Sequence, residues 1–249
     1  MTRLLFCILL FAALPASVSA QVQSAETSVN LSGHQDSPKL VLSARGGLSY
    51  LTASAKEDKK TLQSYGLSED AADDYYRDYK LGYHSRANLG LVFPSGMGGG
   101  IVHRYFSTSA GLTGFFDPQD GVHLIYGETS EQVHINFYGA TFDMQEELSP
   151  KLTGKLSYGI GYTDFRDEMI MMNQPVLITG NNLGLDMAFD LQYLLFGKLT
   201  LNAQLSYFVC TLKKVKFDDG YTSESYELSG NEKQNLSALD LSVGLSYTF

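Results

Sequence analysis

Eight segments of the chain alternate between apolar and polar residues with a period of two, and this pattern limits the fold more than any other feature. It is typical of half-buried β-strands, whose successive side chains point to opposite faces of a sheet. Within one segment, for example, Val133, Ile135 and Phe137 alternate with polar neighbours. The chain is therefore predicted to be all-β. The eight segments are residues 40–50, 81–93, 98–108, 132–137, 152–162, 183–193, 199–209 and 239–249.

The connections between these segments come in two sizes that alternate strictly along the chain. Short connections lie at residues 94–97, 145–150 and 195–197, and long ones at 54–79, 109–130, 165–180 and 212–234. Transmembrane β-barrels have this asymmetry, and strands of about ten residues cross their apolar band of ~25 Å. We therefore predict a closed antiparallel up-and-down transmembrane β-barrel of eight strands, with short periplasmic turns and long extracellular loops.

A soluble β-sandwich or a lipocalin-like barrel would alternate equally well, so the polarity of the two faces has to decide. The polar set carries too many charges for a dry core. We expect this set to face the lumen and the apolar set to face lipid. The charged residues of the polar set are Arg45, Arg86, Lys155, Asp186, Asp190 and Asp240.

Side chains fill the interior of an eight-stranded barrel, so the six charges are predicted to neutralise one another in a lumen network. Counting residues from the short turns pairs Lys155 with Asp190, and closure of the barrel pairs Arg45 with Asp240. This network is interpreted as a structural plug, with a proton or ion gate as the alternative.

Aromatic residues of the apolar set fall near both ends of the strands, as expected of the two interfacial girdles of a membrane barrel. The predicted girdle residues are Tyr50, Tyr83, Phe93, Tyr162, Tyr193, Tyr207, Tyr247 and Phe249. The segment at 98–108 is less regular, because either His103 or Arg104 must face lipid unless a bulge intervenes. Since an arginine near the bilayer midplane costs ~2–4 kcal/mol, we turn Arg104 inward.

The first twenty residues have the features of a secretory signal peptide. They contain the basic Arg3, an apolar run at 4–14 and small residues before a cleavage site after Ala20. The run is shorter than the ~20 residues of a spanning helix. The predicted organisation is therefore a signal peptide (1–20), a flexible periplasmic lead-in (21–38) and an outer-membrane barrel (39–249).

Charge and cysteine content exclude two further features. Acidic residues outnumber basic ones by 27 to 18, giving a net charge of −9, so the chain lacks the basic footprint of a nucleic-acid-binding protein. Cys7 leaves with the signal peptide, and the remaining Cys210 cannot form an internal disulfide alone.

The last eight residues resemble the assembly signal of bacterial outer-membrane barrels, through Ser242, Gly244, Tyr247 and the terminal Phe249. With the strand pattern of the whole segment 39–249, the chain resembles the small eight-stranded outer-membrane proteins of the OmpX, OmpW and OmpA-barrel class. The resemblance implies insertion by the barrel-assembly machinery into the outer membrane of a Gram-negative bacterium. It implies no particular activity, because this fold has several.

No catalytic motif stands out, and the five histidines lack the spacing of a metal site, so neither enzyme activity, a cofactor nor a metal is predicted. We expect a structural and surface-binding role, with lipid and lipopolysaccharide around the barrel and a host or surface ligand at the loops. A narrow porin-like channel is one alternative. A lipid A-modifying enzyme is another, and its candidate residues are His134, Ser107 or Ser109, and Glu131.

Two loop segments have open interpretations. The first long loop combines acids with tyrosines, and could bind divalent cations or a basic partner, or could be an ordinary solvated loop. The apolar run from Met169 to Ile178 is either a contact surface or a continuation of its hairpin. The acids and tyrosines of the first loop are Glu69, Asp70, Asp73, Asp74, Asp78, Tyr75, Tyr76 and Tyr79.

Overall fold

The computed structural model describes residues 37–54, 56–117, 122–171, 173–230 and 233–249. The predicted signal peptide and all but the last two residues of the predicted lead-in lie outside this part of the chain. Eight principal strands are present. They are β1 (Lys39–Leu51), β2 (Leu81–Val92), β3 (Met97–Phe116), β4 (Ile125–Ser149), β5 (Leu152–Met171), β6 (Gln174–Phe196), β7 (Leu199–Leu212) and β11 (Ala238–Thr248).

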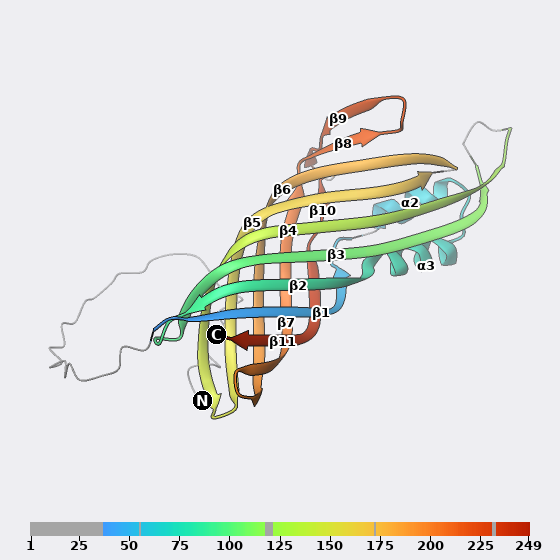
Figure 1. The fold of residues 1–249 in the computed structure, drawn as a ribbon. Helices are drawn as coiled ribbons and strands as arrows, with labels where there is room; N and C mark the ends of the chain where they lie inside the picture. Colours follow the sequence, from blue (N-terminus) through green and yellow to red (C-terminus); the bar gives the residue numbers. More distant parts are fainter. Residues whose placement is uncertain (1–36, 55, 118–121, 172, 231–232) are drawn as a thin grey trace, which may run out of the picture. The chain divides into compact units, whose positions relative to one another are not determined.

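These eight strands form a closed antiparallel ring (Figure 1). Each strand from β1 to β7 pairs with the next along the chain, β7 pairs with β11, and β11 returns to β1 over eleven partner pairs. Because every lateral edge finds a partner, the ring needs no exposed strand edge at membrane height. The predicted eight-stranded barrel is confirmed.

One end of the ring carries the three short turns, at residues 93–96, 150–151 and 197–198; we call it the short-turn end. Gly96 and Gly197 adopt φ angles of 80° and 57° in two of these turns. Glycine adopts such left-handed angles without steric cost. The opposite end is the long-hairpin end.

The prediction of long loops at that end was wrong for two of the four connections, β3–β4 and β5–β6. Strand β3 continues to Phe116, and β4 already begins at Ile125. Only residues 172–173 separate β5 from β6. The run from Met169 to Ile178 therefore continues its hairpin. The alternation of apolar and polar residues is required only where one face of the sheet contacts lipid. It therefore stops at the edge of the membrane, although the paired strands continue beyond it.

The other two connections also contain secondary structure. Residues between β1 and β2 form the helices α2 (Lys56–Ser64) and α3 (Glu69–Lys80). Three short strands follow β7: β8 (Lys214–Asp218), β9 (Ser223–Glu227) and β10 (Gln234–Asn235). β8 pairs with β6 and β9, so this hairpin extends the sheet above the ring.

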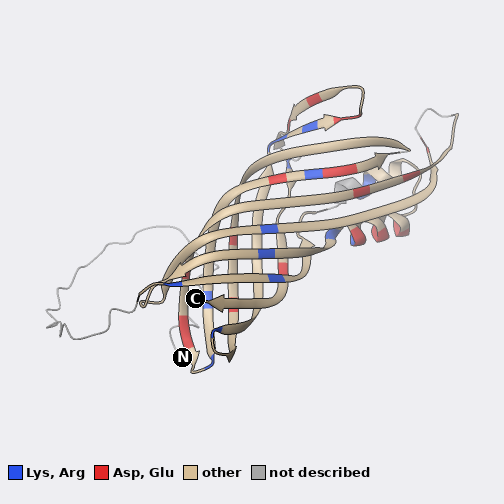
Figure 2. Cartoon of the chain, viewed as in Figure 1, with Lys and Arg blue, Asp and Glu red and all other residues tan. Residues whose placement is uncertain are grey.

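Helix α3 has clear sequence causes. The Ser68 side chain caps it by accepting from Ala71 N, and Glu69 and Asp70 occupy its first turn, where acids favour the helix dipole. Tyr75 and Tyr76 are buried and pack against Ala110 of β3. The remaining acids lie on the exposed side (Figure 2). Neither helix in the described residues has the length and hydropathy needed to cross a membrane.

The two faces of the sheet follow the predicted rule on most strands but not on β4. Val133, Ile135 and Phe137 point inward and are fully buried, and their polar neighbours point outward. The lumen toward the long-hairpin end thus contains a cluster of apolar side chains, which corrects the expectation of a polar filling throughout. The lipid-facing rule fails here because these residues lie on the long-hairpin side of Tyr138, where the outer face of β4 carries the polar Gln132, His134 and Asn136.

Candidate functional site

Three arginines stand side by side inside the barrel. Arg45 of β1 is the cross-strand partner of Arg86 of β2, which is the partner of Arg104 of β3. All three are at most 6 % exposed. Like charges directly opposite one another destabilise a sheet, so each guanidinium needs an acidic partner elsewhere.

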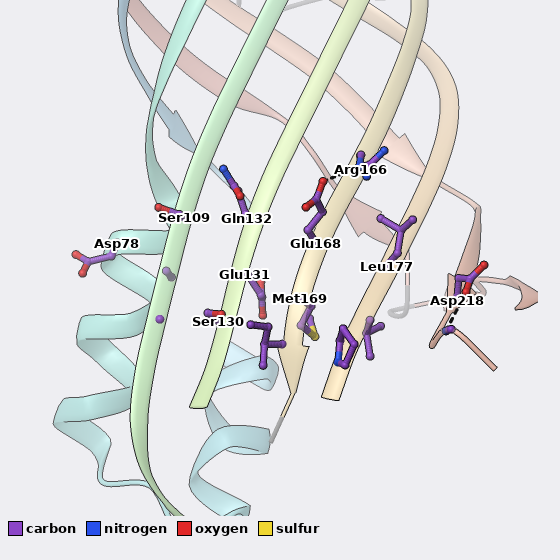
Figure 3. A pocket seen from close by; sticks show the side chains of 16 residues that line it. Asp78, Ser109, Ser130, Glu131, Gln132, Arg166, Glu168, Met169, Leu177 and Asp218 are labelled. Atoms are coloured by element: carbon purple, nitrogen blue, oxygen red, sulfur yellow. Dashed lines mark hydrogen bonds and ion pairs between the residues drawn. The ribbon is translucent and has the colours of Figure 1, made fainter. Parts of the chain in front are cut away.

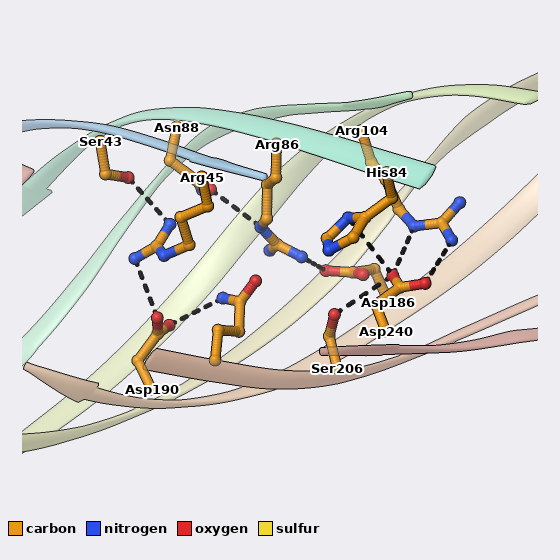
Figure 4. Close-up of polar contacts among 11 residues, drawn as sticks. Ser43, Arg45, His84, Arg86, Asn88, Arg104, Asp186, Asp190, Ser206 and Asp240 are labelled. Atoms are coloured by element: carbon orange, nitrogen blue, oxygen red, sulfur yellow. Dashed lines mark hydrogen bonds and ion pairs between the residues drawn. The ribbon is translucent and has the colours of Figure 1, made fainter. Parts of the chain in front are cut away.

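Those partners lie on other strands of the ring (Figure 4). Arg45 Nη2 lies 2.9 Å from Asp190 Oδ1, and Arg86 Nη1 lies 2.6 Å from Asp186 Oδ2, both on β6. Arg104 donates through Nε and Nη2 to the two carboxylate oxygens of Asp240 on β11, each at 2.7 Å. None of these strands neighbours the strand of its arginine. The three ion pairs therefore cross the lumen.

Glutamine and serine side chains add further hydrogen bonds to this layer. Asp190 accepts from Gln204 Nε2 at 2.8 Å, and Asp240 accepts from the hydroxyls of Ser49 and Ser206. His84 Nδ1 is 3.8 Å from Asp240 Oδ2. Buried charges are tolerated only when such partners surround them.

The six predicted lumen residues thus lie together, but both predicted pairs were wrong. Lys155 is the cross-strand partner of Asp190, yet its Nζ lies 2.9 Å from Asp143 Oδ2 on the other neighbouring strand. Asp190 is occupied by Arg45, and Asp240 by Arg104. Counting residues from a turn gives the position along a strand, but it does not predict which side chains meet across the lumen.

An apolar layer closes the lumen on the long-hairpin side of the charges. Phe137 and Phe208 pack edge to face, with ring centroids 5.4 Å apart, and both are fully buried with Phe106 and Phe165. The Arg104 guanidinium lies 4.6 Å from the centroid of Phe208, so the two layers are in contact. Sequence reasoning missed this layer, because it assigned the alternating Val133, Ile135 and Phe137 to the lipid-facing set.

All eight predicted girdle residues point outward and are between 37 % and 75 % exposed. Tyr50 of β1, Tyr83 of β2 and Tyr162 of β5 lie toward the long-hairpin end; with Tyr138 of β4, which is the cross-strand partner of Tyr162, we call them the upper girdle. Within the terminal motif, Ser242 is buried in the lumen, whereas Tyr247 and Phe249 are outward and in edge-to-face contact.

The residues considered for lipid A modification do not form a triad. Ser107 and His134 are cross-strand partners on the outer face, and Ser109 is the partner of Gln132 one pair further on. Glu131 belongs to the inward set, beside Tyr75. His134 Nδ1 is instead 2.7 Å from Tyr105 Oη. An orienting acid on the other side of the wall cannot hold this imidazole.

Two ionisable groups lie inside the long-hairpin end, beyond the upper girdle. Asp167 of β5 is 3 % exposed, its cross-strand partners are Val133 and Ile178, and burial raises its pKa to about 6. Burial, together with the neighbouring Glu131, raises the pKa of Tyr75. Asp167 Oδ1 has no hydrogen-bond partner among the described residues. A charge on Asp167 is therefore unfavourable.

An open groove of about 840 Å³ lies on the sheet at the long-hairpin end (Figure 3). Ser109, Gln132, Glu168, Leu177 and Asp218 line it and form one row of cross-strand partners from β3 to β8. On each principal strand, these residues alternate in phase with the lipid-facing residues, so their side chains point outward. The groove is therefore on the outer face, further from the short-turn end than the upper girdle.

No cluster of three or more potential metal ligands occurs in the described residues. The acids of α3 are partly engaged in surface ion pairs, Asp73 with Lys59 and Asp74 with Arg77.

Comparison with known proteins supports the fold. No protein-family model matches the chain, and no curated protein matches it. Among solved structures, it is similar to a major outer membrane protein from Thermus thermophilus, with 14 % identity, a TM-score of 0.51 and coverage of 86 % of this chain and 100 % of that one.

Two further likenesses are weaker. Neisserial surface protein A has 12 % identity, coverage of 84 % of this chain and 97 % of that one, and a TM-score of 0.46. The outer membrane protease OmpT from Escherichia coli has 10 % identity, coverage of 91 % and 100 %, and a TM-score of 0.41. Scores below 0.5 are too low to support an assignment. The closed ring and the Thermus likeness together show that this chain has the fold of the small outer-membrane β-barrel proteins.

Proposed function

We propose that this protein is an integral barrel of the bacterial outer membrane with a closed lumen, and that it acts through its extracellular end. The long-hairpin end is then extracellular, and the short-turn end periplasmic. The signal peptide and the terminal assembly motif fit export and insertion by the barrel-assembly machinery. The proposal favours a structural and surface-binding role over the channel and enzyme alternatives.

The observation that carries the proposal is the double closure of the lumen. Three ion pairs with side chains at most 2 % exposed cross it, and a layer of fully buried phenylalanines lies directly above them. A solute would have to separate buried charges and displace aromatic rings, each at a cost of several kcal/mol. This argues against a porin-like channel.

Conductance in planar lipid bilayers tests the closed lumen. Reconstituted protein is expected to give no current steps of defined size, whereas a steady and reproducible single-channel conductance would contradict the proposal. Folding is checked in the same preparation by the heat-dependent shift in gel mobility that compact barrels show.

A surface-binding role is supported by the exposed tip of the β3–β4 hairpin. Phe115 and Tyr126 form an edge-to-face pair with centroids 5.1 Å apart, and both are more than 60 % exposed, as is Leu124 beside them. Exposed aromatic clusters are characteristic of binding surfaces.

Cells that display the protein can be tested for adherence to immobilised extracellular-matrix proteins. Replacing Phe115 and Tyr126 by serine is expected to reduce adherence, and Tyr221→Ser, in the exposed β8–β9 turn, is the matched control. Equal adherence of wild type, tip variant and cells without the protein would argue against this role.

A further inference from the structure

The outer face of β3, β4 and β5 changes character just beyond the upper girdle. Tyr138 and Tyr162 are cross-strand partners there. Four residues further along β4 and β5, His134 and Arg166 are cross-strand partners on the same outward face. Ser107 of β3, which is also the partner of Tyr83 on β2, continues this row. A hydroxyl, an imidazole and a guanidinium thus stand side by side on a surface that faces lipid lower down.

Neighbouring groups position this row. The rings of Tyr105 and His134 are stacked, and the 2.7 Å contact between Tyr105 Oη and His134 Nδ1 fixes the imidazole. Arg166 donates through Nε to Glu168 Oε1 at 2.8 Å, and its side chain is 54 % exposed. A guanidinium has five N–H donors, so this bond leaves most of its capacity for a ligand.

The height of the row matches a lipid headgroup. Four residues of strand span about 13 Å, or roughly 10 Å above the girdle at a strand tilt of about 40°. The polar zone of a bilayer begins at the girdle and is roughly 5–8 Å deep for ordinary phospholipids. His134 and Arg166 therefore lie level with the outer part of a large headgroup.

We propose that His134 and Arg166 bind a phosphate of an outer-leaflet glycolipid, and that the adjoining groove takes the sugar of its headgroup. This inference rests on the proposed membrane location. Guanidinium and imidazole groups suit a phosphate oxygen, and Ser109, Gln132 and Glu168 offer the groove donors and acceptors for sugar hydroxyls.

The surrounding charges favour a glycolipid over a simple anionic phospholipid. Asp164 and Glu168 flank Arg166 on the outward set of β5, and Asp218 lies at the far side of the groove. This surface is therefore not generally basic, and phosphate attraction alone would be weak. Binding must draw on the sugar contacts as well.

The test uses the full-length protein folded in detergent micelles and measures its dissociation constants. The titrants are purified lipopolysaccharide, the same lipopolysaccharide with its lipid A phosphates removed, phosphatidylglycerol and inorganic phosphate. Arg166→Gln is expected to weaken binding of intact lipopolysaccharide about tenfold or more, as loss of a charged hydrogen bond does. His134→Gln should weaken it less, and dephosphorylated lipopolysaccharide should bind wild type and Arg166→Gln alike.

Lys198→Gln, which removes an exposed positive charge at the short-turn end, is the control and should leave the affinity unchanged. The proposal is overturned if Arg166→Gln binds like wild type, if Lys198→Gln weakens binding equally, or if phosphatidylglycerol or inorganic phosphate binds as tightly as lipopolysaccharide. Failure of the protein to fold as a heat-modifiable barrel would instead refute the proposed function. A folded barrel without this preference refutes only the glycolipid site.

Discussion

Replacing the buried Asp167 by asparagine should stabilise the barrel in a pH-dependent way. Its carboxyl lies between Val133 and Ile178, and burial raises its pKa from 3.8 to about 6. A shift of about two units corresponds to about 3 kcal/mol of folding free energy. Because the unfolded chain releases this proton near pH 4 and the folded chain near pH 6, stability is lost as the pH rises between these values.

Asparagine has nearly the same shape and no charge, so Asp167→Asn removes this cost. The gain in unfolding free energy is expected to be close to zero at pH 4, to grow up to pH 6 and to level off at about 3 kcal/mol by pH 8. Other groups titrate over the same range, but the difference between variant and wild type cancels their contributions.

The measurement is equilibrium unfolding by guanidinium in micelles, followed by far-ultraviolet circular dichroism at several pH values. The chain contains no tryptophan, so intrinsic fluorescence would rest on tyrosine alone. Asp164→Asn is the matched control, because Asp164 lies on the exposed face of the same strand. A gain that is equal at pH 4 and pH 8, or a control with the same profile, would refute the reasoning.

Three further variants test the interior. Asp240→Leu leaves Arg104 buried without a carboxylate and should cost about 3–5 kcal/mol in the same unfolding assay, most of it recovered by Arg104→Leu/Asp240→Leu; a neutral single variant would argue against this ion pair. Phe137→Ala should also cost about 3–5 kcal/mol yet remain silent in planar bilayers, because the ion pairs still close the lumen; current steps would show that the apolar layer is the only seal. Gly244→Ala should lower the free energy of unfolding of the folded barrel as well as its rate of assembly. An effect on the assembly rate alone would show that the close packing of Gly244 does not matter in the folded barrel.

The ring and its closure were predictable because lipid imposes a strict rule on the sequence. Every second residue must be apolar across the membrane, and an arginine on that face is costly. The same rule predicted that Arg104 faces inward, and in the structure this side chain is fully buried. Above the membrane the rule no longer applies, so the sequence predicted loops where β3 to β6 continue as strands.

Pairing within the lumen was not predictable in the same way. A cross-strand partner follows from register, and Lys155 does lie opposite Asp190. However, a long side chain can reach either neighbouring strand or cross the barrel, and only the shear of the ring fixes which acid it meets. The arginine row shows the consequence, since Arg45 and Arg86 are neighbours by register and must both seek partners on β6.

Gly244 connects the terminal motif to this interior. It is the cross-strand partner of Arg45, and a Cβ placed on it would lie 2.1 Å from Ala44 O and 2.6 Å from Arg45 Cγ. Any larger residue would displace the stem of the side chain that reaches across to Asp190. The resemblance to an assembly signal explains this glycine only by a role during insertion into the membrane. The geometry gives it a second role. It makes room for the first ion pair of the lumen plug, and that requirement persists after assembly is complete.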